Sequence, residues 1–123
     1  MAKSFKTVHS GDLDWRDAKD VLTLPEGVQV KVLFQDDATQ HIDMLIKFPP
    51  GYKEPEHVHE AEHSILVMQG RSLVRGQEMR PGDYVFGPAN QPHGPFEYPE
   101  GLVVFASFRG GSAHHHFAGS PPR

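Results

Sequence analysis

Turn-forming residues recur at short intervals along the chain and limit the length of any regular element. Glycine and proline supply 23 of the 123 residues, 12 and 11 respectively, well above their usual share of about 12%. No segment keeps a 3.6-residue apolar period over three turns, and residues 14–22 are the only weak candidate for a helix. The sequence therefore excludes helical bundles and coiled coils, and many short strands are expected.

Alternation of apolar and polar residues predicts where those strands lie. The expected strands are 28–35, 42–48, 64–69, 71–75, 84–86 and 102–108. Within 64–69, residues 65–68 are apolar at consecutive positions, which predicts a strand buried on both faces. Short strands separated by turns predict an all-β domain, either a sandwich or a barrel. We expect one domain over 1–123, with the barrel at about 20–109, an N-terminal arm at 1–19 and a loose tail at 110–123.

Charge, hydropathy and cysteine content remove several classes of protein. The net charge is −4 and the 12 basic residues form no stripe, so no nucleic-acid partner is expected. No apolar run approaches the roughly 20 residues of a membrane span. The first residues lack the apolar segment of a secretory signal, and a cytoplasmic location is expected. The absence of cysteine excludes disulfides, thiolate ligands and a cysteine nucleophile.

Clustered histidines are the strongest indication of chemistry among the nine that the chain contains. His57, His59 and His63 occupy odd positions, so on a strand all three side chains point to one face. His93 follows His63 after 30 residues, a separation that lets a neighbouring strand supply a fourth ligand. His114, His115 and His116 are consecutive and cannot all face one ion from a strand, so they are interpreted as part of the solvated tail.

Four neutral imidazoles without thiolates suit a divalent transition metal: Fe(II), Mn(II), Ni(II), Cu(II) or Zn(II). No anionic ligand in this set offsets the metal charge, which favours an acidic bound water and anionic substrates. Imidazoles bind metal only when neutral, so metal affinity is expected to fall below about pH 6.5. The expected partner is a small oxygen-bearing substrate, and a homodimer is expected because small barrels expose edge strands.

The spacing of these histidines resembles the two sequence motifs of the cupin superfamily. Gly51-(x5)-His57-x-His59-(x3)-His63-(x6)-Gly70 is similar to the first motif, G(X)5HXH(X)3,4E(X)6G. Gly82-(x5)-Pro88-x-Asn90-(x2)-His93-(x3)-Glu97 is similar to the second, G(X)5PXG(X)2H(X)3N. The resemblance implies a single cupin barrel, a double-stranded β-helix or jelly roll, with His57, His59, His63 and His93 as metal ligands.

Three departures from the motifs bear on the site that the resemblance implies. His63 replaces the metal-binding glutamate, which leaves either a four-histidine site or a three-histidine site of His57, His59 and His93, as in cupin-type oxygenases. Asn90 replaces a glycine, and asparagine tolerates the positive φ of such a turn. Glu97 replaces the final asparagine and is the candidate general acid or base. Further candidates for the substrate pocket are Tyr84, Phe86 and Arg75.

The function that the resemblance implies stays open between several classes. Residues 70–83 are similar to small cupins that include β-diketone-cleaving and hydroxyacetophenone dioxygenases, and to the cupin domain of zinc-binding anti-sigma factors. An Fe(II)-dependent dioxygenase is favoured. The alternatives are a non-oxidative isomerase, cyclase or lyase that uses Zn, Mn or Ni, a metal-dependent sensor without turnover, and a metal that only stabilises the barrel.

Overall fold

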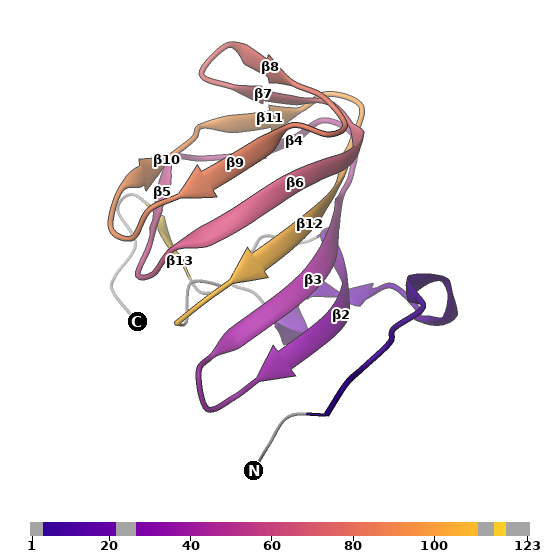
Figure 1. Ribbon diagram of the computed structural model, residues 1–123. Helices are drawn as coiled ribbons and strands as arrows, with labels where there is room; N and C mark the ends of the chain where they lie inside the picture. The colour runs from indigo at the N-terminus through magenta and orange to yellow at the C-terminus, as the bar shows by residue number, and fades with distance from the viewer. Residues whose placement is uncertain (1–3, 22–26, 111–114, 118–123) are drawn as a thin grey trace.

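The computed structural model describes residues 4–21, 27–110 and 115–117, and strands make up most of this part of the chain (Figure 1). The strands are β1 (Arg16–Asp17), β2 (Gln29–Asp36), β3 (His41–Phe48), β4 (Tyr52–Glu54), β5 (His57–His59), β6 (His63–Gly70), β7 (Ser72–Val74), β8 (Gln77–Met79), β9 (Tyr84–Gly87), β10 (Pro92–His93), β11 (Phe96–Tyr98), β12 (Leu102–Phe108) and β13 (His115–Phe117). Two single-turn 3-10 helices, Ser10–Asp12 and Ala18–Asp20, precede β2. None of the helices in the described residues has the length and apolar character needed to cross a membrane.

Six antiparallel strands form the large sheet, in the order β1-β2-β3-β12-β6-β9. Its inner face is apolar because alternate residues of each strand point the same way. One buried row crosses four strands in register, from Val30 through Ile46 and Val104 to Val67. Each of these side chains is at most 3% exposed. This face forms one wall of the interior.

Two smaller sheets supply the rest of the barrel wall. Their strand orders are β4-β11-β7-β8 and β10-β5-β13. Figure 1 shows β4, β11 and β7 as a second layer behind the large sheet, with β5 and β10 at one end of it. Tyr52 and Tyr98 stack with ring centroids 5.9 Å apart, and Phe48 lies 4.6 Å from Tyr98. These rings join β4 and β11 to the apolar core.

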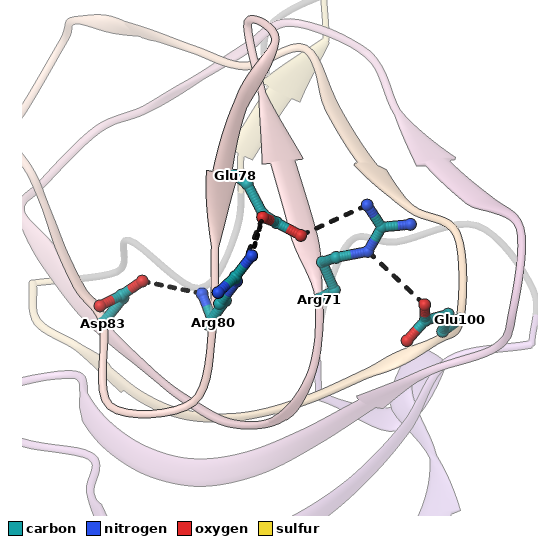
Figure 2. A network of polar contacts seen from close by, with 5 residues as sticks. All are labelled: Arg71, Glu78, Arg80, Asp83 and Glu100. Carbon is teal, nitrogen blue, oxygen red and sulfur yellow. Dashed lines mark hydrogen bonds and ion pairs between the residues drawn. The ribbon is translucent and has the colours of Figure 1, made fainter.

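A polar network on the surface connects the β7–β8 hairpin to the turns beside it (Figure 2). Glu78 accepts from Arg80 at 2.8 Å and from Arg71 at 3.3 Å. The Arg80 amide donates to Asp83 at 2.8 Å, and Arg71 lies 3.6 Å from Glu100. Exposed pairs of this kind stabilise a fold by about 0–1 kcal/mol each. Arg71 therefore has a structural environment away from the histidines.

Three expectations from the sequence need correction. The strand at 64–69 is not buried on both faces, because Leu66 and Met68 are 38% and 49% exposed on the outer face of β6. The N-terminal arm joins the sheet, since β1 pairs with β2. The tail is not loose throughout, because β13 pairs antiparallel with β5. His114, which the sequence analysis placed in the tail, lies outside the described residues, as do 111–113 and 118–123.

Candidate metal centre

The structure gathers four imidazoles at one end of the barrel interior. His57 and His59 come from β5, His63 begins β6, and His93 ends β10. All four are buried, with exposed fractions of 3%, 3%, 5% and 9%. Ring centroids are 4.8 Å apart for His57 and His59, 4.1 Å for His59 and His63, and 4.9 Å for His63 and His93.

Strand pairing explains how residues distant in sequence meet here. β10 pairs antiparallel with β5, and this register sets His93 opposite His57. His57 and His59 share a face of β5 because they are two residues apart. His63 lies on a different strand, after a bend at 60–62, so the prediction that one strand aligns all three histidines was wrong in its reason. His63 nevertheless faces inward, against the ring of Phe108.

Backbone carbonyls orient two of the rings. The Nδ1 atom of His57 lies 2.8 Å from the Pro55 carbonyl oxygen, which can only accept, so Nδ1 carries the proton and Nε2 the lone pair. His93 bonds the Pro88 backbone, and its Nε2 atom is buried without a hydrogen-bond partner. The Nδ1 atom of His63 is also buried without a partner. Metal-ligating histidines are commonly fixed in this way through their second nitrogen.

Burial keeps His57, His63 and His93 in the neutral form that binds metal. Desolvation, followed by the neighbouring His93, lowers the pKa of His63 to about 4. Desolvation also lowers the pKa of His57 and of His93, although hydrogen bonds to Pro55 and Pro88 oppose the change. An uncharged imidazole with a free lone pair is the state that a transition metal requires.

Gly87, at the end of β9, leaves space for the histidine rings, and Asn90 shapes the turn that follows. A Cβ atom at Gly87 would overlap His63 Cε1 and come within 2.6 Å of His93 Cε1. Asn90 has φ of 60°, as expected for a residue in a glycine position, and its amide donates to the His59 carbonyl at 2.8 Å. The loop between β9 and β10 therefore holds His93 against β5.

His57, His59 and His63 border a mostly apolar cavity of about 70 Å³, which is also lined by a carboxylate missed by the sequence analysis. Glu54 on β4 is 6% exposed. Its Oε1 atom lies 3.1 Å from His57 Nε2, and its Oε2 atom accepts from the Tyr98 hydroxyl at 3.3 Å. Burial raises the pKa of Glu54 to about 7, and the bond from Tyr98 opposes the rise. A glutamate three residues before His57, beside a proline, gave no signal in the sequence.

The donor chemistry of this cluster fits a divalent transition metal. Imidazole nitrogens are suitable ligands for Fe(II), Mn(II), Ni(II), Cu(II) and Zn(II), and the unpartnered nitrogens of His63 and His93 are available to one. Within 4–21, 27–110 and 115–117, no three such side chains are already set around a metal position. Coordination by three or more of them therefore requires the rings to turn.

The other sequence-predicted site residues lie outside the cavity. Tyr84 and Phe86 are 59% and 48% exposed, because alternation turns Val85, which lies between them, toward the interior. Glu97 pairs in register with Lys53 on the outer face of β11, and their charged groups are 3.9 Å apart. Arg75 is exposed and donates to the Gly94 carbonyl at 2.8 Å. None of these four side chains lines the cavity, although the charge of Arg75 contributes to the lowered pKa of His93.

A small β-barrel with an inward-facing histidine cluster defines a cupin-type protein, as the two motifs imply. The chain belongs to the ChrR cupin-like domain family, whose model matches residues 3–118. It is 31% identical to the dimethylsulfoniopropionate lyase DddQ of Ruegeria pomeroyi over 71 residues, which cover 54% of this chain and 35% of the lyase. The chain therefore matches well under half of that enzyme.

Solved structures extend the likeness of fold. A Methylibium petroleiphilum structure with a provisional acetylacetone dioxygenase assignment is 22% identical with a TM-score of 0.74, covering 100% of this chain and 91% of that one. The anti-sigma protein ChrR, in its Rhodobacter sphaeroides complex with SigE, is 24% identical with a TM-score of 0.58. That match covers 78% of this chain and 49% of the other. These structures show the cupin fold.

Proposed function

We propose that the protein is a metal-dependent cupin enzyme that acts on a small oxygen-bearing substrate, and that its reaction is a dioxygenation. The observation that carries this proposal is the buried group of four imidazoles beside an apolar cavity. His57, His59, His63 and His93 would hold the metal. A bound divalent metal would supply Lewis-acid activation of a substrate oxygen and, if it is iron, redox chemistry with dioxygen.

The residues around the cluster have the properties that such a reaction needs. The apolar walls exclude water, which strengthens polar interactions inside the cavity. The small cavity of about 70 Å³ suits a substrate of few heavy atoms. The likeness to the Methylibium structure supports β-diketones as the first substrates to examine.

A second candidate, a non-oxidative lyase, is favoured by the sequence similarity to DddQ. An elimination at the same site needs no dioxygen, and zinc or manganese would serve as well as iron. The two candidates therefore differ in their requirement for oxygen and in the identity of the metal.

Oxygen consumption by the Fe(II)-loaded protein tests the proposal. We expect acetylacetone or a related β-diketone to consume one dioxygen per substrate, and His59→Ala to abolish the uptake. Anaerobic loss of dimethylsulfoniopropionate, equal with Zn(II) or Mn(II), would establish the lyase instead. Tight metal binding without turnover of either substrate class would contradict both and indicate a sensor domain.

A further inference from the structure

Glu54 is a buried acid whose polar contacts in the described part of the chain include no lysine or arginine. It is 6% exposed, and its polar contacts are with His57 and the hydroxyl of Tyr98. An isolated carboxylate is costly to bury unless a cation or several hydrogen bonds compensate its charge. Glu54 nevertheless lies in the barrel interior, beside the histidine cluster.

The register of β4 and β11 explains why Glu54 points inward. Glu54 pairs with Phe96, and both side chains line the cavity. Tyr98, two residues further on β11, shares this face and donates to Oε2. The hydroxyl therefore fixes one carboxylate oxygen and leaves Oε1 directed at His57.

The lone pair of His57 Nε2 faces two groups at once. Glu54 Oε1 and His59 Nε2 each lie 3.1 Å from it. Because His57 Nδ1 carries the proton that the Pro55 carbonyl accepts, Nε2 has a single lone pair and accepts a hydrogen bond from only one of the two. A metal ion can instead accept an electron pair from all three atoms once the rings have turned to surround it.

The separations match those between neighbouring ligands of one ion. Ligand atoms at about 2.1 Å from a metal and at right angles to one another are about 3.0 Å apart. The four imidazoles contribute no charge, so a carboxylate among them would offset part of the charge of a divalent cation. Carboxylate and imidazole together suit Fe(II), Mn(II) and Zn(II).

We infer that Glu54 is an anionic ligand of the metal centre, bound through Oε1 beside His57 and His59, while Tyr98 positions the carboxylate through Oε2. The inference deepens the proposed function, since it rests on the same metal centre. It adds to the four histidines a residue on β4 that stands at a variable position of the first motif.

Calorimetric titration with Mn(II) and Zn(II) tests the role of Glu54 without reference to turnover. We expect Glu54→Gln to weaken binding by at least about 100-fold, because its amide removes the negative charge and donates to His57 Nε2. Tyr98→Phe, which keeps the carboxylate, is expected to weaken binding by less than about 10-fold. Glu97→Gln is the matched control, the same substitution on the outer face of the neighbouring strand, and should bind as the wild type does.

A crystal structure of the Mn(II)-loaded wild type, with anomalous data, separates direct ligation from positioning and decides the matter even if a variant fails to fold. We expect Glu54 Oε1 at about 2.0–2.2 Å from the ion. An ion held by histidines with Oε1 outside its coordination shell would overturn the inference, as would wild-type affinity in Glu54→Gln. If the wild type binds no metal, the inference and the proposed function both fail. Metal binding through Glu54 without turnover would contradict the proposed function alone.

Discussion

The α-carbon of Gly87 faces the rings of His63 and His93, each of which has one buried nitrogen without a hydrogen-bond partner. A Cβ atom here would overlap His63 and crowd His93. The two imidazole rings would have to move, because their side chains can rotate whereas the β9 backbone is held by its pairing with β6. We expect Gly87→Ala to weaken Zn(II) binding by at least about 10-fold with little loss of secondary structure. Isothermal calorimetry and circular dichroism measure the two effects.

Gly11→Ala is the control for that substitution, because a Cβ at Gly11 has nothing within 4 Å. It should leave metal affinity unchanged. Wild-type affinity in Gly87→Ala would show that the positions of His63 and His93 do not limit binding.

The raised pKa of Glu54 predicts how the metal-free protein responds to pH. Burial raises this pKa from 4.5 to about 7, so the folded state holds the proton more tightly than the unfolded chain. The unfolding free energy of the wild type should then fall as the pH rises from 4.5 to about 7. That of Glu54→Gln should not fall for this reason, because the glutamine side chain is neutral at every pH. At about pH 8 we expect the variant to be more stable by on the order of 1–3 kcal/mol, and below about pH 4.5 nearly equal to wild type.

Urea unfolding of chelator-treated protein at several pH values measures this difference. If the difference in unfolding free energy between wild type and Glu54→Gln does not change with pH, Glu54 does not have the raised pKa described here.

At the scale of elements, the long strands were predictable from sequence, and so were the short strands β7 and β9, but most of the other short strands were not. β2, β3 and β12 carry enough alternating residues to reveal which face is buried, and all three lie close to the predicted ranges. Only two or three residues make up each of the strands β4, β8, β10 and β11. Such short segments contain too few residues to show an alternation of apolar and polar side chains. These strands form through pairing with partners distant in sequence.

The same limit separates the parts of the site that could be predicted from those that could not. The histidines lie in spaced motifs, so sequence alone identified the residues that the structure gathers. Glu54 enters the site because β4 pairs with β11, and no local pattern carries that register. Tyr84 and Phe86 were assigned to the pocket although the intervening Val85 faces it, since alternation identifies two faces without saying which one is interior.

The turn between β9 and β10 depends on a left-handed residue at Asn90. Its φ of 60° is strained for most side chains, above all for β-branched ones. We expect Asn90→Gly to keep wild-type stability and metal affinity, and Asn90→Val to lose roughly 1–2 kcal/mol of unfolding free energy. Thermal and urea denaturation test this, and an undiminished stability in Asn90→Val would show that the turn relaxes without cost.

At the scale of the whole molecule, the outer face of β6 and β9 carries a patch of four uncharged side chains, Leu66, Met68, Tyr84 and Phe86. These four are 38–59% exposed. β9 is at the edge of the large sheet, paired only with β6 among the described strands. A two-fold interface places one patch against its own copy, and an uncharged patch meets no like charge there. We therefore propose that a second copy of the chain covers it.

Sedimentation velocity tests this assembly. We expect a dimer for the wild type and a monomer for the double variant Leu66→Lys with Phe86→Ser, which places charge and polarity on the patch. Phe5→Ser, at a residue 98% exposed elsewhere, should remain dimeric. A monomeric wild type at micromolar concentration would overturn the proposal.

The four imidazoles belong to two different sheets, since His63 is on a strand of the six-stranded sheet and the others are on the three-stranded one. An ion held by both would tether them and suppress the opening motions of that end of the barrel. Amide hydrogens of β5 and β10 should then exchange faster after chelation, while those of β3 and β12 keep their protection. Metal loading would therefore govern the mobility of the end of the barrel that holds the four imidazoles, in addition to the chemistry there.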